Sequence, residues 1–354
     1  MTGYRSATEP MTEPAAPLSA PVPALRWGVL GAAKIALRRV IPSMQSTPRS
    51  LVVAIASRDA GKARAAADEL GIPRAYGSYE ELLADGEVDA VYIPLPNHLH
   101  VPWSMRAALA GKHVLCEKPI ALSAKEARTL LPVRDQTGVQ IAEAFMVRTH
   151  PQWHRVRELI AAGRIGRLGL IVGHFSYARH GNDDIRARPE YGGGALLDIG
   201  GYPVTMSRWL FGAEPQAVIA ELERDPDTGV DSLVSAVLRF PAGQASFTCA
   251  GALMLHQRMQ LFGDRGRIEI EIPFNPPLDG PSRLILDDGR DLVGGGREII
   301  EVPPADQFAL QAEQFARAVH GEGSVPVPLE DAIANMAVLD AVVRSAETRR
   351  WEEP

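Results

Sequence analysis

The first 150 residues alternate short apolar runs with stretches that have the spacing of amphipathic helices. Apolar runs at 25–30, 51–56, 89–95, 113–117 and 139–145 are typical of buried strands. Strands that alternate with helices of this length form a parallel sheet with helices packed on its faces. The pattern therefore predicts an α/β protein that begins with a doubly wound domain.

The pattern changes in the second half of the chain. A helix is predicted over 150–162, and runs of alternating apolar and polar residues follow, separated by turn residues such as 241–243. Two helices, predicted over 307–319 and 329–349, end the chain. We therefore expect a C-terminal α+β domain at 148–354 with an open, mainly antiparallel sheet. We also expect its last helix to pack back on the N-terminal domain.

The length and charge of the chain narrow its class. Its 354 residues exceed the roughly 250–300 at which one hydrophobic core stops growing, so two domains are expected. The formal net charge of −6 comes without a basic run, so we expect no nucleic-acid partner. No apolar run approaches the roughly 18 residues needed to span a bilayer, and we expect no membrane partner.

Residues 1–24 are rich in proline and contain almost no large apolar residue. They lack the basic start and the apolar centre of a signal peptide, and we expect a disordered or extended arm. The two cysteines, Cys116 and Cys249, are expected to be buried, reduced thiols. Together these features predict a cytoplasmic protein.

The first predicted strand runs into a loop that has the outline of a phosphate-binding turn. The loop reads Gly-Ala-Ala-Lys-Ile-Ala from residue 31, with alanines in two of the three glycine positions of the G-x-G-x-x-G/A pattern. Gly31 permits the tight turn, Ala33 still lets a pyrophosphate approach, and Lys34 and Ile35 open the helix. We expect a Rossmann dinucleotide-binding domain over 25–147. The alternative is a tight turn without a ligand.

The end of the second predicted strand bears on the choice of cofactor. An NAD-dependent enzyme usually has an acid there to hold the ribose 2′-hydroxyl. This chain has Ser57 and Arg58, with Lys62 shortly after, and these groups suit a 2′-phosphate. We therefore expect NADP(H) rather than NAD(H). The alternative is a solvated helix start in which Asp59 is the cap.

Four further motifs resemble one known family when taken together and in this order. They are IPLPNHLH at 93–100, GKHVLCEKP at 111–119, EAFMVRTHPQ at 143–152 and GGGALLDIGGY at 192–202. They resemble the glucose–fructose oxidoreductase, inositol dehydrogenase and MocA family over residues 25–354. The resemblance implies a Rossmann domain followed by an open sheet, with the active site between them.

The resemblance also assigns residues to that site. It implies that Lys118 lies beside the nicotinamide and the substrate, and that the bond before Pro119 is cis. It further implies a cofactor-binding set made of Pro94, Leu95, Asn97, His98, Glu117, Lys118 and Arg148. Tyr202 stands where inositol dehydrogenases have histidine, and tyrosine resembles the branch with aldose and xylose dehydrogenases, dihydrodiol dehydrogenases and keto-sugar reductases.

Hydride transfer to or from a carbinol needs a proton carrier and a group that stabilises the oxyanion. Asp198 and Tyr202 are four positions apart and would share a helix face. We expect Tyr202 to donate or accept the proton, with the Lys118 ammonium favouring its ionised form. Lys118 would stabilise the oxyanion, and Asp198 would hold substrate hydroxyls and orient the lysine.

These observations predict an NADP-dependent oxidoreductase that acts on an aldose or a keto-sugar. Two alternatives remain, namely a glycoside hydrolase that retains its NAD and a sensor without catalytic activity. A sensor would be marked by loss of the catalytic lysine, and this chain keeps both Lys118 and Tyr202, which argues against a sensor. The nine histidines and two cysteines form no Cys/His cluster with the spacing of metal ligands, so we expect no metal. We expect a homodimer or homotetramer built through the C-terminal sheet.

Overall fold

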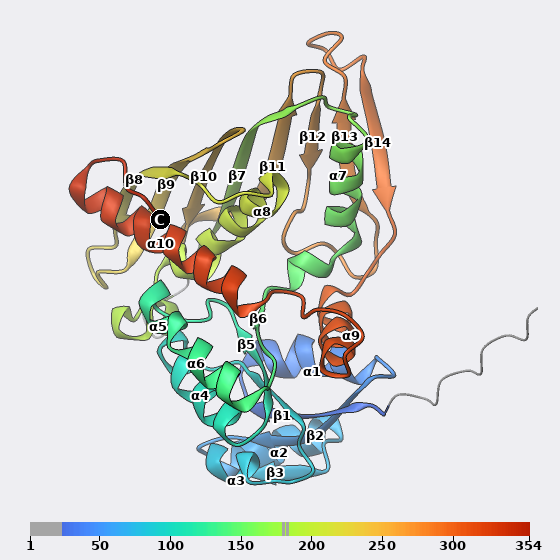
Figure 1. Ribbon diagram of the computed structural model, residues 1–354, viewed down its shortest axis with the longest axis vertical. Helices are drawn as coiled ribbons and strands as arrows, with labels where there is room; N and C mark the ends of the chain where they lie inside the picture. The colour runs from blue at the N-terminus through green and yellow to red at the C-terminus, as the bar shows by residue number, and fades with distance from the viewer. Residues whose placement is uncertain (1–22, 179–180, 182–183) are drawn as a thin grey trace, which may run out of the picture.

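The computed structural model describes residues 23–178, 181 and 184–354. The expected N-terminal arm falls almost wholly on residues 1–22, which lie outside the described residues. Two sheets, each with its own helices, are stacked one above the other (Figure 1). The fold is α/β, as the pattern of apolar runs predicted.

The N-terminal sheet has six parallel strands in the order β3-β2-β1-β4-β5-β6, which is the order of a Rossmann fold. The strands are β1 (Leu25–Leu30), β2 (Ser50–Ala56), β3 (Arg74–Tyr76), β4 (Ala90–Ile93), β5 (His113–Glu117) and β6 (Ile141–Ala144). The strand order reverses between β1 and β4. Ligands bind at such a switch point, beyond the carboxyl ends of the strands.

Helices cover both faces of this sheet. They are the π-helical η1 (Ala36–Val40), α1 (Ile41–Gln45), α2 (Ala60–Leu70), α3 (Tyr79–Leu83), η2 (Asn97–Leu99), α4 (His100–Leu109), α5 (Ala124–Arg128) and α6 (Leu130–Thr137). α2 begins at Ala60, because the Asp59 side chain accepts the Lys62 N–H and caps the helix. The helix that was expected to open at Lys34 and Ile35 is present, and its π-helical segment η1 continues into α1.

The C-terminal sheet has eight strands in the order β14-β13-β12-β11-β7-β10-β9-β8. They are β7 (Leu168–Ala178), β8 (Ala217–Arg224), β9 (Asp231–Phe240), β10 (Gly243–Ala250), β11 (Ala252–Gly263), β12 (Arg267–Ile270), β13 (Ser282–Asp287) and β14 (Arg297–Val302). β7 and β10 are parallel, and the other neighbouring strands are antiparallel. The predicted open, mainly antiparallel sheet is confirmed.

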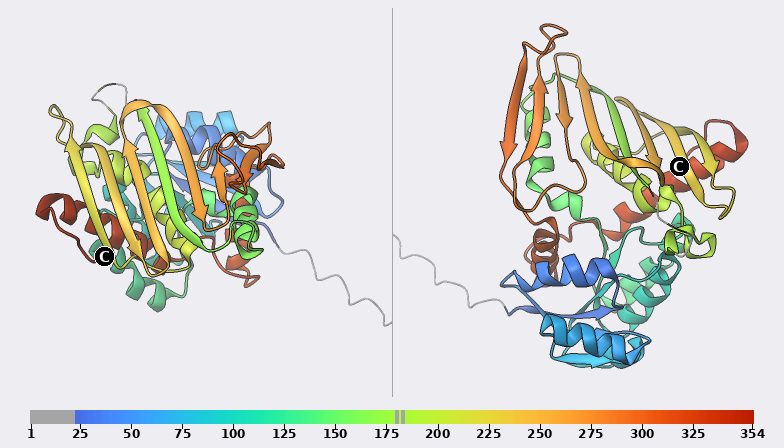
Figure 2. Two further views of the ribbon diagram at one scale, coloured as in Figure 1. Left: turned by 90° about the horizontal axis from the view of Figure 1, so that it is seen from above. Right: turned by 180° about the vertical axis from the view of Figure 1, so that it is seen from behind.

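The remaining helices follow β6 in the sequence. They are η3 (Met146–Thr149), α7 (Pro151–Ala161), η4 (Ile185–Ala187), η5 (Pro189–Tyr191), the π-helical η6 (Leu196–Gly200), α8 (Gly201–Phe211), α9 (Gln307–Val319) and α10 (Leu329–Thr348). α7, α8 and α10 lie on one face of the C-terminal sheet, and the views from above and behind show the strands of the opposite face (Figure 2).

The last two helices also contact the Rossmann domain. Phe315 of α9 packs on Trp27 of β1 with ring centroids 5.2 Å apart. Asp340 of α10 accepts the Ala124 N–H at the start of α5. In the described part of the chain, no helix has the length and apolar character to cross a bilayer. Both cysteines are buried and free.

Candidate active site

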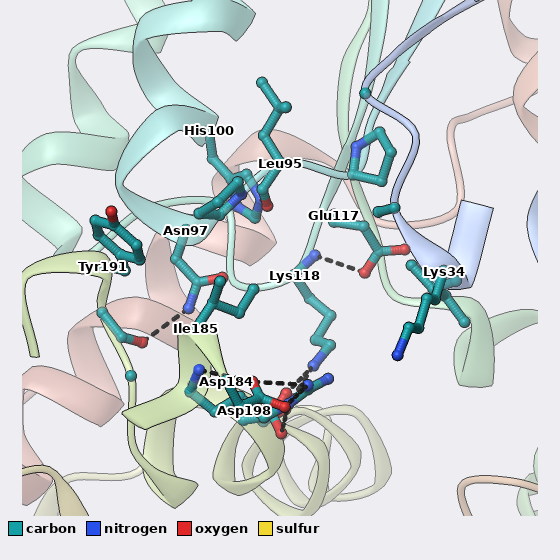
Figure 3. A pocket seen from close by; sticks show the side chains of 18 of the residues that line it. Lys34, Leu95, Asn97, His100, Glu117, Lys118, Asp184, Ile185, Tyr191 and Asp198 are labelled. Atoms are coloured by element: carbon teal, nitrogen blue, oxygen red, sulfur yellow. Dashed lines mark hydrogen bonds and ion pairs between the residues drawn. The ribbon is translucent and has the colours of Figure 1, made fainter. Parts of the chain in front are cut away.

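One large cavity, of about 1020 Å³, lies where the two domains meet. The carboxyl ends of β1, β2, β4 and β5 supply its Rossmann side, and β7, η4, η6 and α8 supply the opposite side. Figure 3 shows the Lys118 side chain extending across the cavity toward Asp198. The cavity therefore occupies the switch point at which a dinucleotide is expected.

The phosphate loop has the backbone that its sequence predicted. Gly31 adopts φ +116°, and a Cβ there would lie 3.0 Å from Leu95 Cδ2, so only glycine fits. Ala33, Lys34 and Ile35 line the cavity as the following helix begins. The Leu37 N–H donates to the Ala33 carbonyl at 3.0 Å, so the loop runs directly into the helix, whose N-terminus attracts an anion.

Ser57, Arg58 and Lys62 line the same cavity at the end of β2. The Asp59 carboxylate accepts the Lys62 N–H and is thereby committed to capping α2, while Ser57 Oγ accepts the Asp59 N–H. Tyr79, which the sequence analysis missed, also lines this region and is hydrogen-bonded to Arg58. Burial raises the pKa of Tyr79, and Arg58 opposes that rise.

The loop after β4 places three of its predicted residues at the cavity, namely Pro94, Leu95 and Asn97. Asn97 Nδ2 also donates to the Gly192 carbonyl of the opposite domain at 2.9 Å. His98 does not line the cavity. Its ring stacks on Tyr191 with centroids 4.5 Å apart, so it forms a contact between the domains.

Arg148 was expected near the cleft, and the structure places it elsewhere. Its side chain is 12% exposed, forms an ion pair with Asp331 at 3.0 Å, and lies over the Trp209 ring. It is absent from the cavity lining. The chain turns at η3 after β6, and this turn directs the guanidinium toward Trp209 of α8 and Asp331 of α10.

Lys118 leaves β5 and reaches across the cavity to η6. The peptide bond between Lys118 and Pro119 is cis. Lys118 Nζ donates to the Asp198 side chain (Oδ1, 3.0 Å) and to the Asp198 main-chain carbonyl (2.6 Å). Burial favours neutral lysine, but Asp198 and Tyr202 outweigh it and raise the pKa of Lys118. The side chain is therefore an ammonium ion at neutral pH.

Asp198 is surrounded by donors, two of which the sequence analysis missed. Its Oδ2 accepts from Tyr177 Oη at 2.6 Å and from Arg186 Nε at 2.8 Å. Burial opposes ionisation, but Lys118 and Arg186 outweigh it and hold the pKa of Asp198 well below its usual range. Since both carboxylate oxygens already accept bonds, orienting Lys118 is the role that the contacts of Asp198 favour.

Tyr202 lies in the same cavity, with Lys118 Nζ 5.4 Å from its ring centroid. Three phenylalanine rings fix its orientation: those of Phe145, Phe175 and Phe274. Its hydroxyl faces Met146 Sδ at 3.8 Å, and a thioether is a weak acceptor. We expected Lys118 to favour tyrosinate. It does lower the pKa, but burial dominates and raises the pKa of Tyr202 to about 12.

Glu117 precedes Lys118 and lines the cavity. Its Oε1 accepts the hydrogen bond of Tyr92 Oη at 2.7 Å, and burial raises its pKa. Among the described residues, no group of three or more histidine, cysteine, aspartate or glutamate side chains is placed to hold a metal ion. The cavity thus combines a phosphate loop, an ammonium group and a phenol.

Two family models match the chain. Residues 25–145 match the oxidoreductase family with an NAD-binding Rossmann fold, and residues 153–269 match the GFO/IDH/MocA C-terminal domain. The chain belongs to this family. The resemblance seen in the motifs is confirmed, and the protein is an NAD(P)-dependent oxidoreductase, as those motifs predicted.

Several relatives are similar over almost the whole chain. The oxidoreductase ORF334 of Rhizobium meliloti is 48% identical over 93% of this chain and 98% of its own. The D-xylose 1-dehydrogenase (NADP(+)) 2 of Haloferax volcanii is 40% identical over 92% and 98%. The 3-ketoreductase KijD10 of Actinomadura kijaniata, solved with NADP and TDP-benzene, has a TM-score of 0.85 and 32% identity over 91% and 98%.

Proposed function

We propose that the protein is an NADP-dependent oxidoreductase that transfers hydride between the nicotinamide and a sugar, at a carbinol or carbonyl carbon of an aldose or keto-sugar. The observation that carries the proposal is the meeting of Lys118, Asp198 and Tyr202 in one cavity. That cavity is continuous with the phosphate loop at Gly31. Hydride chemistry needs these two parts side by side.

The preference for NADP rests on the end of β2. Arg58 and Lys62 line the cavity there, whereas Asp59 is absent from the cavity lining and caps α2 through its Oδ1. A ribose 2′-hydroxyl would lack its usual acidic partner at this position, while a 2′-phosphate would gain two cations. The xylose dehydrogenase and the 3-ketoreductase named above are both NADP proteins, which supports the same choice.

The cofactor, when bound, supplies or accepts the hydride, and the side chains handle the proton. Because the pKa of Tyr202 is about 12, its phenol is protonated at neutral pH and can donate to the oxygen of a carbonyl undergoing reduction. Lys118, held as an ammonium by Asp198, stabilises the negative charge that develops on that oxygen. In the oxidative direction the same groups act in reverse.

Solved variants of the 3-ketoreductase support this pair. One replaces a tyrosine by phenylalanine, and another replaces a lysine by alanine. In that chain the two positions are separated by the same number of residues as Lys118 and Tyr202. A hydrolase with retained cofactor or a sensor is not favoured, because the named relatives are dehydrogenases and reductases and both reactive side chains are present.

The proposal is tested with a panel of substrates and both cofactors. Aldoses such as D-xylose and D-glucose, a keto-sugar and a short alcohol are assayed with NADP(H) and NAD(H), and the absorbance of reduced nicotinamide is followed. We expect a sugar to be the best substrate, with NADP(H) preferred at least about tenfold, which corresponds to about 1.4 kcal/mol. A short alcohol that outruns every sugar would contradict the substrate class.

A further inference from the structure

The turn that carries Lys118 is held by two buried side chains that come from different elements. His100 Nδ1 pairs with the Pro119 carbonyl at 2.6 Å. Glu143 Oε1 accepts the Ile120 N–H at 2.8 Å. His100 is fully buried and Glu143 is 1% exposed, so water does not compete for either contact. The backbone on which the ammonium depends is therefore fixed by side chains of α4 and β6.

Glu143 differs from an ordinary surface acid. Its second oxygen, Oε2, is buried and has no hydrogen-bond partner in the described part of the chain. Ionising a carboxyl in such surroundings is unfavourable. Burial therefore raises the pKa of Glu143 to about 7, although the Ile120 N–H opposes this.

Charged and titratable groups face Glu143 from each element packed around it. Lys118 and Cys116 come from β5 and the turn after it, Arg208 comes from α8, and Asp331 comes from α10. Lys118 and Arg208 favour the ionised carboxyl, whereas Asp331 disfavours it. A carboxyl in this balance changes its charge near neutral pH.

We propose that Glu143 is a positioning residue for Lys118, and that its ionised form holds the turn in the arrangement that supports turnover. A hydrogen bond to a carboxylate is roughly twice as strong as one to a neutral acid, so ionisation tightens the contact with Ile120. The negative charge also attracts the Lys118 ammonium. The inference rests on the proposed function, because it assigns Glu143 to the same site.

The first test compares turnover in three proteins across pH 6 to 8. Glu143→Gln keeps an oxygen that can accept from Ile120 but cannot ionise. We expect the ratio of wild-type kcat to that of Glu143→Gln to rise about three- to tenfold across this range, with a midpoint near 7. The control is Glu126→Gln, since Glu126 Oε2 accepts the Leu122 N–H at 2.8 Å nearby; its ratio should stay flat.

A second readout does not need turnover. In protein labelled with ¹⁵N-isoleucine, the amide signal of Ile120 should shift with pH around a midpoint near 7, and Glu143→Gln should abolish the shift. If the wild type turns over no sugar, the proposed function fails, and an Ile120 signal that still titrates would show only that the ionisation of Glu143 controls the turn. If the kcat ratio is constant, or the wild-type Ile120 signal does not titrate between pH 6 and 8, Glu143 has no such role.

Discussion

At the scale of single residues, the site separates orientation from proton transfer. Asp198 accepts from Lys118, Tyr177 and Arg186, so its contacts orient the cations. Among the described residues, the partner of the Tyr202 hydroxyl is the weak acceptor Met146 Sδ, so we expect that hydroxyl to be available to a substrate oxygen. The tyrosine is thus the side chain whose removal should affect chemistry with little effect on binding.

We predict that Tyr202→Phe lowers kcat by about 10²- to 10⁴-fold, the usual contribution of general acid–base catalysis. The ring contacts with three phenylalanines do not involve the hydroxyl, so packing and NADP affinity should hardly change. Steady-state kinetics and a cofactor titration measure the two quantities. Near-wild-type kcat on the best sugar would show that another group moves the proton.

The proposed preference for NADP also depends on single side chains. Arg58→Ala removes a guanidinium that lines the cavity beside Tyr79. We predict that NADP binding weakens by about tenfold or more while NAD binding changes much less, because only NADP carries the 2′-phosphate. Fluorescence titration with both cofactors measures this difference. An equal loss for both would place Arg58 away from the 2′-phosphate.

At the scale of elements, the regular parts of both sheets followed from the sequence. The apolar runs of β1, β2, β4, β5 and β6 are buried on both faces and were visible as such. The three-residue β3 and the π-helical turns η1 and η6 were not predicted. A three-residue strand leaves no periodicity to detect, and a single π turn differs from an α-helix only in its hydrogen bonding.

The site residues also divide into those that the sequence located and those that it did not. The loop at Gly31 and the turn at Lys118 were located correctly, because each is formed by a short continuous motif. Tyr177 and Arg186 were missed because their contacts with Asp198 depend on how β7 and η4 fold over η6. Arg148 was misplaced because a motif does not state the direction of a side chain.

The η6 segment makes a prediction of its own about stability. Asp198→Asn leaves the Lys118 ammonium without its counter-ion at a site where both side chains are about 15% exposed. Breaking a buried pair costs about 3 kcal/mol, and we expect a loss of that order at pH 7 by urea unfolding. Asp184→Asn is the control, since Asp184 pairs with the more exposed Arg186 and should cost under about 1 kcal/mol.

The pH dependence of that loss follows from the sign of the shift. The folded state depresses the pKa of Asp198, so its stabilisation is present above the unfolded value of about 3.9 and is lost as pH falls below it. The difference between wild type and Asp198→Asn should therefore stay constant from pH 8 to pH 5 and shrink only below about pH 4. A difference that already declines between pH 8 and 6 would point to another group.

At the scale of the whole molecule, several contacts hold the two domains together. α9 packs on β1, α10 contacts α5, and Asn97 and His98 contact the 191–192 segment across the cavity. These contacts hold Lys118 and Asp198 at bonding distance although they come from different domains. The arrangement uses one face of the C-terminal sheet and leaves the other available for assembly.

The register of the strands defines that other face. Val172 of β7 lies beside Ser246 of β10 and Gln260 of β11, and Ser246 lies beside Val237 of β9. Two residues along β7 on the same face, Leu170 lies beside Phe262 of β11. Eight strands about 4.8 Å apart give a face roughly 35 Å wide, and the eleven residues of β7 extend about as far along the strands. The area of this face therefore exceeds the roughly 800 Å² that each partner buries in a stable interface.

We predict a homodimer or homotetramer in which this face is buried. Val172→Arg puts a charge at the centre of the face, where its cross-strand neighbours are the uncharged Ser246 and Gln260, and should shift the protein toward monomer. Leu109→Arg is the matched control, because Leu109 is 59% exposed on α4 of the other domain and should leave assembly unchanged. Light scattering at micromolar concentration measures the mass, and a monomeric wild type would refute the prediction.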